Sequence, residues 1–158
     1  MIKGIKLWIK RILTTLFGLY LLIVGANYLY HYTQPTNDEL DQYRVGFEVM
    51  YDKKVDYSIH FYDPNEPTSV LAYCLLLGGK GMYVAVNRDN WRKLTQDRRM
   101  LTMMHEMGHC SMNLKHNDAE FKDGCPVYLM ASYIMPQYCI DDHGIGYYLS
   151  SLSIQEKH

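Results

Sequence analysis

His105-Glu106-Met107-Gly108-His109 is the stretch on which the interpretation of this 158-residue chain depends. It lies within residues 95–112, where apolar residues occupy most of the circumference that a helix would present. Thr95 is a residue type that caps helix N-termini, so the pattern predicts a helix that begins there. A helix that is apolar nearly all round is typical of a buried, central position. Because polar side chains in such a place cost free energy unless they have partners, the histidines and the glutamate need a functional reason.

The spacing of the two histidines predicts a metal site. Residues four apart lie on one helix face about one turn apart, so His105 and His109 can bind one Zn²⁺ at about 2.0–2.1 Å each. Glu106 is rotated by about 100° from His105 and lies beside the metal rather than on it. Gly108 has no side chain, which lets another segment approach the helix next to the ligands. We therefore expect a zinc-activated water with Glu106 as its general base.

A catalytic zinc usually takes three protein ligands and leaves one position for water. His116 is the leading candidate for the third ligand, but a continuous helix would place it about 10 Å beyond His109. Asn113 tolerates the left-handed conformation that ends helices, so a turn there would bring His116 back toward the metal. The alternatives are the acidic residues that follow, namely Asp118, Glu120 and Asp123.

Residues 105–116, HEMGHCSMNLKH, resemble the zinc signature H-E-x-x-H-x-x-G-x-x-H of the metzincin clan. The third histidine comes one residue later than in the clan, and Asn113 stands where the clan has a turning glycine. Residues 125–130, CPVYLM, resemble the tight turn whose methionine lies beneath the metal in metzincins, and Met130 matches that methionine.

Tyr133 follows this turn and is a candidate hydrogen-bond donor to a developing oxyanion. Tyr128 and Tyr138 are the competing candidates for the same role.

Residues 82–133 as a whole resemble small bacterial and phage-type metallopeptidases that carry an H-E-x-G-H-C motif. An extended segment at 84–86, Trp91 and the zinc helix follow one another in the same order as in that family. The resemblance implies an α+β, zincin-like domain of metzincin type, with a mixed sheet, a central zinc-binding helix and a C-terminal helix. It also implies a peptidase, without indicating which substrate is cleaved.

The N-terminal region has the composition of a targeting segment. The first 37 residues carry four of the 16 basic residues and none of the 17 acidic ones. An apolar run over 12–30 follows the basic stretch and is just long enough to cross a hydrocarbon core. Small residues at 24–26 suit a signal peptidase equally well. We therefore expect a signal anchor or a signal peptide over 1–30 and a metallopeptidase domain over 31–158, either membrane-anchored with an extracytoplasmic domain or secreted or periplasmic.

The four cysteines are an even number, which suits one or two disulfides in an exported domain. Their sequence positions leave the pairing open. None has the C-x-x-C spacing of thiolate zinc sites, so we expect the zinc to be bound without cysteine. The cysteines are Cys74, Cys110, Cys125 and Cys139.

The rest of the domain has recognisable local patterns. Asn37 is placed to cap an amphipathic helix over 38–51. A glycine-rich turn at 78–81 joins two apolar segments and indicates a hairpin. If its second strand, 82–86, edges the sheet beside the cleft, it would align a peptide by backbone pairing. The other predicted elements are a strand over 55–62 ending in a turn at 63–67, a strand over 70–77, a helical turn at 90–93 and a C-terminal helix over 141–155.

These observations predict a zinc metalloendopeptidase that acts on a peptide or protein and works as a monomer. The net charge of -1 gives no indication of nucleic-acid binding. One alternative is a zinc hydrolase that cleaves a non-protein amide, such as one in a cell-wall polymer. Another is a membrane-anchored binding module with a structural metal, for which a fourth ligand such as Asp118 or a cysteine is expected. His143, near the start of the C-terminal helix, is an outside candidate for a ligand or a transition-state donor.

Overall fold

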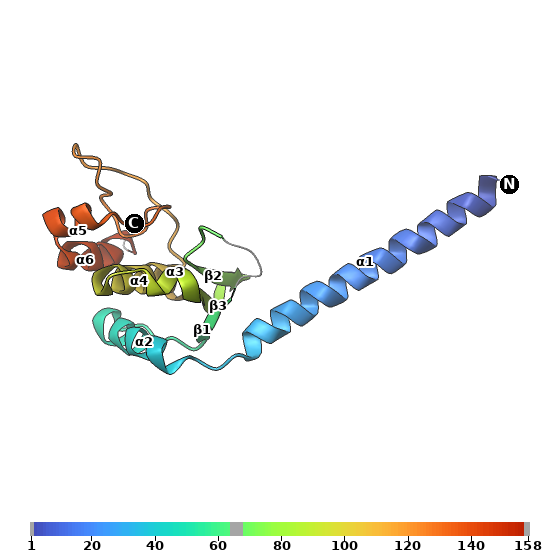
Figure 1. Ribbon diagram of the computed structural model, residues 1–158, viewed down its shortest axis with the longest axis horizontal. Helices are drawn as coiled ribbons and strands as arrows, with labels where there is room; N and C mark the ends of the chain where they lie inside the picture. The colour runs from blue at the N-terminus through green and yellow to red at the C-terminus, as the bar shows by residue number, and fades with distance from the viewer. Residues whose placement is uncertain (1, 64–67, 157–158) are drawn as a thin grey trace. The chain divides into compact units, whose positions relative to one another are not determined.

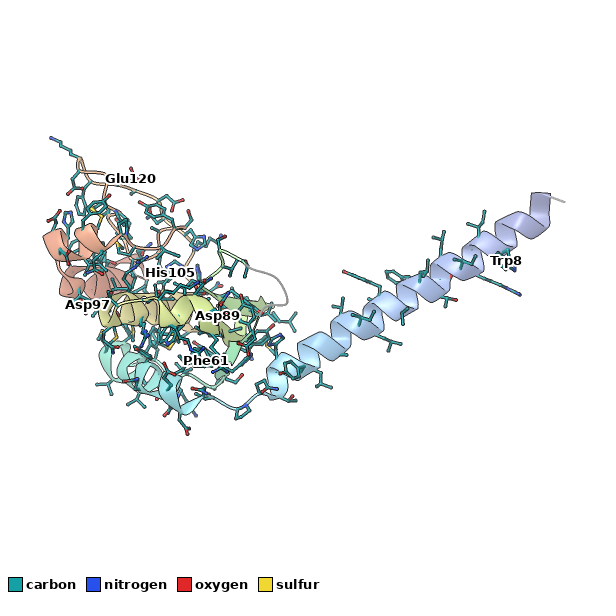
Figure 2. All side chains as sticks on the ribbon, in the orientation of Figure 1. Trp8, Phe61, Asp89, Asp97, His105 and Glu120 are labelled. Carbon is teal, nitrogen blue, oxygen red and sulfur yellow. A yellow bond between two sulfur atoms is a disulfide. The ribbon has the colours of Figure 1, made fainter. Side chains whose placement is uncertain are left out.

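The computed structural model describes residues 2–63 and 68–156, which fall into two compact units, Met1–Gln34 and Pro35–His158 (Figure 1). Helix α1, Ile2–Thr33, makes up most of the first unit. Its segment Trp8–Thr33 is long and apolar enough to cross a membrane, and none of it is buried. Side chains project from all sides of this helix, among them Trp8 (Figure 2). Signal sequences and membrane anchors share these properties, so α1 suits both of the expected roles.

The second unit is an α+β domain, which confirms the predicted class. Its three strands form a mixed sheet, and helices pack around it. In chain order the elements are α2 (Asp38–Tyr51), β1 (Ser58–Tyr62), β2 (Ala72–Leu77), β3 (Lys80–Asn87), α3 (Arg88–Arg92), α4 (Gln96–Met112), α5 (Gln137–His143) and α6 (Ile145–Gln155).

Helix α2 has the bounds that the sequence predicts. The Asn37 side chain accepts a hydrogen bond from the backbone N–H of Glu39, 3.0 Å away, and so caps the helix. Leu40, Tyr43 and Phe47 recur at steps of three and four and are buried. This apolar face packs on α4 and thereby closes one side of the core.

The strand order is β1-β3-β2, with β1 parallel and β2 antiparallel to the central β3. The predicted hairpin is therefore confirmed, with Gly78 and Gly79 at positive φ in its turn. The condition for peptide pairing with the strand at 82–86, that it edges the sheet, is not met: β3 is central, and β2 is the edge strand that lines the cleft. The strands predicted over 55–62 and 70–77 begin later, at Ser58 and Ala72. Most of the predicted turn at 63–67 lies outside the described residues.

Helix α4 occupies the centre of the domain, between the sheet, α2 and α6 (Figure 1). Its approach to the sheet depends on Gly81 in β3. A Cβ atom at that position would lie 2.6 Å from the carbonyl oxygen of Cys110, closer than real Cβ contacts come. The helix therefore lies almost directly on the β3 backbone at Cys110, the residue that follows His109.

The C-terminal region differs from the single helix predicted over 141–155. It forms α5 and α6, which meet at Gly144, where φ is 81°. A positive φ cannot belong to a right-handed helix, so the chain changes direction there. The helical turn predicted at 90–93 is confirmed as α3, whose Trp91 is buried.

Candidate metal centre

Helix α4 begins and ends as its sequence predicts. The Thr95 hydroxyl oxygen accepts a hydrogen bond from the Arg98 backbone N–H, 3.4 Å away. At the other end Asn113 adopts the left-handed conformation, with φ 54° and ψ 31°. The N–H of Leu114 then closes the last turn on the carbonyl of Gly108, 3.2 Å away. This turn reverses the chain, so residues after 113 run back along the helix.

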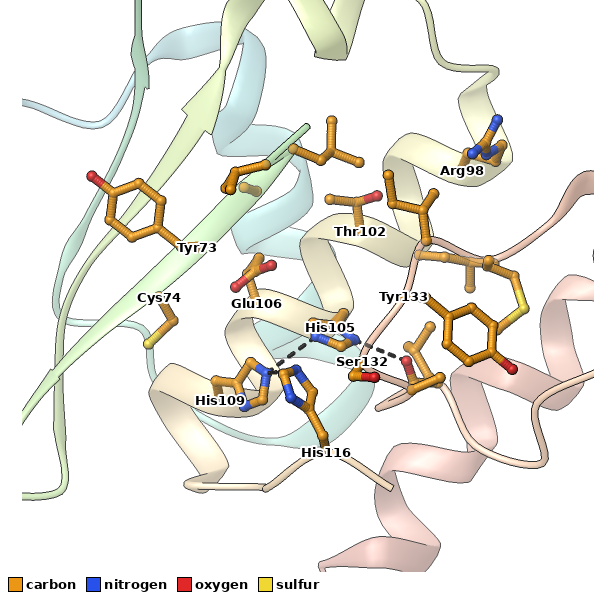
Figure 3. A pocket seen from close by; sticks show the side chains of 18 of the residues that line it. Tyr73, Cys74, Arg98, Thr102, His105, Glu106, His109, His116, Ser132 and Tyr133 are labelled. Atoms are coloured by element: carbon orange, nitrogen blue, oxygen red, sulfur yellow. Dashed lines mark hydrogen bonds between the residues drawn. The ribbon is translucent and has the colours of Figure 1, made fainter. Parts of the chain in front are cut away.

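The reversal brings three histidine rings together (Figure 3). The Nε2 atom of His109 lies 3.1 Å from Nε2 of His105 and 3.1 Å from Nε2 of His116. Two nitrogens bound to one tetrahedral zinc at about 2.0–2.1 Å lie roughly 3.3 Å apart, so the observed spacing fits that ion. The three rings are one of the residue groups in the described chain whose atoms are placed to share a metal.

The tautomers of these rings follow from their backbone partners. Nδ1 of His105 lies 2.9 Å from the carbonyl oxygen of Leu129, and Nδ1 of His109 lies 2.6 Å from that of Leu114. A carbonyl oxygen can only accept, so both Nδ1 atoms carry the proton and both Nε2 atoms present a lone pair. Facing lone pairs 3.1 Å apart repel unless a cation lies between them. The donor set therefore fits a bound metal ion.

A proton shared by the rings is the alternative to a metal ion between the facing lone pairs, but burial of the rings disfavours it. Burial lowers the pKa of His105 to about 4, although the bond to Leu129 opposes the shift. It also lowers the pKa of His109. Both rings therefore remain neutral at physiological pH, which is the state that binds metals.

The acidic residues considered as alternatives to His116 bond elsewhere. Asp118 accepts hydrogen bonds from the Ser132 backbone N–H and hydroxyl, at 2.6 and 3.0 Å. Asp123 accepts from the Cys125 backbone N–H and lies 2.8 Å from Nε2 of His143. Glu120 accepts from the hydroxyl of Tyr133, 3.1 Å away. Within the described residues, His116 is the one that completes the group around His105 and His109.

Glu106 lies beside the three rings and faces Cys74 on β2 (Figure 3). Its side chain is buried, with 8% of the residue exposed. This burial raises the pKa of its carboxyl to about 7, and a hydrogen bond with the Cys74 backbone partly opposes the shift. The position one residue after His105 thus places a carboxyl group beside the nitrogens and not among them.

Met130 is fully buried against the helix on the side of Gly108. A Cβ atom at Gly108 would lie 2.9 Å from the Met130 sulfur and 3.1 Å from Leu152, so the glycine makes room for both side chains. The Asn117 N–H donates to the Met130 carbonyl, 2.8 Å away, and joins this segment to the one that carries His116. The expectation that Gly108 admits another segment beside the histidines is confirmed.

The structure does not bring the Tyr133 hydroxyl to the histidines. It donates to Glu120 and points away from the rings (Figure 3). Tyr128 lines a second cavity of about 320 Å³ that lies beyond His116, and Tyr138 is exposed on α5. The role of oxyanion donor therefore stays a prediction for all three tyrosines.

His143 lies in a different environment from the one considered for it. It ends α5, its ring stacks on Phe121 at 4.5 Å, and it bonds to Asp123. Asp123, Cys125 and His143 are close enough to suggest a second metal group. The sulfur of Cys125 is bonded to Cys139, however, so it is not available as a thiolate.

Two disulfides join the cysteines whose pairing the sequence leaves open. Cys74–Cys110 connects β2 to the residue after His109, and Cys125–Cys139 connects the segment before Met130 to α5. No cysteine in the described chain is free, so none supplies a fourth ligand as a thiolate. The two disulfides are consistent with an oxidising, extracytoplasmic environment.

A cleft of about 530 Å³ opens over the three histidines and Glu106. Residues 69–74, leading into and along the edge strand, form one wall, and residues 131–135 form the other. Arg98 and Thr102 extend the floor along α4 away from the histidines (Figure 3), and Leu101 of the same helix also lines the cleft. The three histidines thus lie at the bottom of a groove of the size that small ligands and short peptides occupy.

Several residues that build this site gave no sequence signal. The carbonyls of Leu114 and Leu129 orient the rings, but every residue has a carbonyl. Asp118 fixes the second wall through Ser132, which depends on two segments 14 residues apart.

In comparisons with protein-family models, curated proteins and solved structures, none matches this chain. The arrangement of these side chains is therefore what indicates the chemistry.

Proposed function

We propose that this protein is a zinc-dependent metallopeptidase with a zincin-like fold of metzincin type. The convergence of three histidine Nε2 atoms beneath a cleft, with a buried glutamate beside them, carries the proposal. His105, His109 and His116 would hold the ion, and three nitrogen donors with an open side are typical of catalytic zinc. When bound, zinc supplies a Lewis acid that polarises a carbonyl and makes water a better nucleophile at neutral pH.

Glu106 is the proposed general base. It takes a proton from the attacking water and afterwards delivers it to the leaving amine. Its position favours this role because it shares the cleft with the histidines while lying outside their group. The backbone of Cys74 helps to hold its carboxylate. Met130 supports the helix from below through its contact with Gly108.

The free edge of β2 supports a peptide as the substrate. One side of β2 pairs with β3, and residues 72–74 line the cleft on the other side. An extended peptide can add to such an edge through backbone hydrogen bonds. This arrangement needs no particular side chain, whereas an amide in a cell-wall polymer offers fewer backbone groups for pairing.

The structural-metal alternative has less support. Structural zinc sites have four protein ligands. In the described residues, Asp118 bonds to Ser132 and all four cysteines form disulfides. We also propose that α1 directs the domain out of the cytoplasm, either as an anchor or as a cleaved signal, which agrees with the disulfides.

Glu106→Gln tests the proposal in the full chain, purified in detergent. We expect one zinc per chain to be retained and hydrolysis to fall by about 10²- to 10⁴-fold, because Gln cannot accept the proton. Zinc is measured by elemental analysis, and activity with casein, a peptide library and peptidoglycan. Glu120→Gln is the matched control, since Gln still accepts from Tyr133 and the residue lies outside the histidine group.

Undiminished activity in E106Q would overturn the role of Glu106. Zinc-dependent release from peptidoglycan without cleavage of any peptide would assign the protein to the non-protein amides.

A further inference from the structure

Arg98 lies at the end of the cleft away from the histidines, and no partner among the described residues explains its position. It lies in the first turn of α4, seven residues before His105, which is two helical turns or roughly 10 Å along the axis. It lines the cleft (Figure 3). Its Nε atom is buried without a hydrogen-bond partner, and none of the ion pairs in the described chain includes it.

Arg99, the next residue in α4, has a structural role that can be compared with the position of Arg98. Arg99 donates from Nε to the Trp91 carbonyl, 3.2 Å away, and its guanidinium lies over the Trp91 ring. The Arg98 side chain makes no comparable bond to any residue that the structure describes. A cation in the first turn is also unfavourable, because the helix N-terminus is itself positive. Stability of the fold therefore does not account for Arg98.

The direction of the cleft places Arg98 relative to a bound peptide. The Val70 carbonyl, just before β2, accepts a hydrogen bond from the side chain of Asn90 in α3, the same helix that Arg99 contacts. The start of β2 and the start of α4 thus lie at one end of the cleft, and Cys74 lies beside Glu106 at the other. Antiparallel pairing is the more stable arrangement for a peptide beside β2. Because β2 starts at the Arg98 end of the cleft, the C-terminal part of such a peptide would lie near Arg98.

We infer that Arg98 binds a carboxylate of the substrate on the C-terminal side of the cleaved bond, an inference that rests on the proposed peptidase function. The roughly 10 Å from His105 corresponds to about three residues of extended chain. Among the described residues lining the cleft, Arg98 is the only arginine or lysine, and Leu101, Ile134 and Met135 are apolar members of the same lining. A guanidinium in such surroundings forms strong, paired hydrogen bonds to a carboxylate.

The carboxylate has two possible sources with the same chemistry. If it is the C-terminus of the substrate, the protein removes short peptides from chain ends. If it is an Asp or Glu side chain, the protein cleaves within chains at acidic sites. Peptides that carry only one of these two carboxylates separate the two sources.

Binding is measured by fluorescence anisotropy with the zinc-loaded full chain carrying E106Q, so that it is read without turnover. The probes are dye-labelled hexapeptide mixtures in three forms: with a free C-terminus, with an amidated C-terminus, and amidated with one Glu. We expect one of the two carboxylate-bearing forms to bind at least tenfold more tightly than the neutral amide. R98Q should abolish this preference, and R98K should keep part of it because the charge remains.

Arg92→Gln is the matched control, because it removes an exposed positive charge outside the cleft and should keep the full preference. Equal zinc content in all variants shows that the site is intact. The inference is overturned if R98Q keeps the preference, if R92Q loses it equally, or if all three peptide forms bind alike. Failure of the peptidase proposal shows separately, as absence of cleavage by the protein with Glu106.

Discussion

The ring of His109 and the carbonyl of Leu114 are joined by a hydrogen bond of 2.6 Å across the end of α4. This bond sets the tautomer of a proposed ligand, and it forms only because Asn113 turns the chain back. The same turn brings His116 within 3.1 Å of His109. The turn that ends α4 therefore also assembles the histidine group.

The first prediction concerns metal affinity. His116→Ala should lower zinc affinity by more than the roughly 10- to 100-fold that loss of an outer-shell partner costs, because it removes a direct ligand. His143→Ala is the matched control, since His143 bonds to Asp123 away from the group, and it should keep full affinity. Competition with a chromogenic chelator measures both. A reversed result, with H143A losing zinc and H116A keeping it, would place the metal at the other cluster.

The second prediction compares two helical glycines. Gly108→Ala should destabilise the fold by about 1–3 kcal/mol, because the new Cβ would overlap the Met130 sulfur. Gly46→Ala in α2 should instead stabilise it by about 0.5–1 kcal/mol, since its Cβ would meet only Met104 at 4.0 Å. Urea unfolding of the two variants measures both free energies. Equal effects of the two changes would contradict the close approach at Gly108.

The third prediction separates the two disulfides. Replacing Cys74 and Cys110 by Ala opens a loop of 36 residues and should cost roughly 4 kcal/mol, against about 3 kcal/mol for Cys125 and Cys139 with their 14-residue separation. Only the first pair connects the edge strand β2 to α4, the helix that carries His105 and His109. We therefore expect C74A/C110A to raise KM far more than C125A/C139A, in peptide assays at a temperature where both remain folded. Similar KM values would show that the connection does not position the substrate.

The fourth prediction concerns acid stability. Hydrogen bonds from the Cys125 backbone and from His143 lower the pKa of Asp123 below its ordinary value of 3.8. The folded state therefore favours the carboxylate, and this stabilisation is present above about pH 4 and is lost as pH falls through the lowered value. Asp123→Asn should be less stable than the unmodified chain at pH 7, and the difference should shrink below pH 4. Denaturant titrations across this range measure it, and a difference that grows in acid would contradict the assignment.

Helix ends could be predicted because their chemistry is local. Asn37, Thr95 and Asn113 each occupy the capping position that their residue type favours, and the structure confirms all three. A cap depends on a side chain and on backbone groups two to five residues away, so the sequence window contains everything that matters.

The sheet order and the C-terminal break could not be predicted in the same way. Strand β1 pairs with β3 through residues 25 positions apart, such as Ser58 and Tyr83, and alternation within a strand does not identify its partner. Gly144 interrupts a run whose apolar spacing continues on both sides, so periodicity alone predicts one helix.

The candidate site was predictable to the extent that its groups are side chains on one helix. The spacing of His105, Glu106 and His109 sets their relative directions before any tertiary contact forms. The position of His116 depends on the loop that carries it, which left the acidic alternatives open. The proposed role of Arg98 could not be predicted from the sequence, because it depends on the residues that form the opposite wall of the cleft.

The contact between Gly81 and Cys110 has an evolutionary consequence. Any larger residue at 81 would push α4 off the sheet, so a lineage that keeps this geometry is constrained at a strand position that supplies no side chain to the histidine group. Unrelated sequences can contain a short H-E-x-x-H motif by chance. A glycine in the middle strand, together with a cysteine directly after the second histidine, is therefore a stricter criterion for this packing than the short motif, because the two residues meet in one close contact.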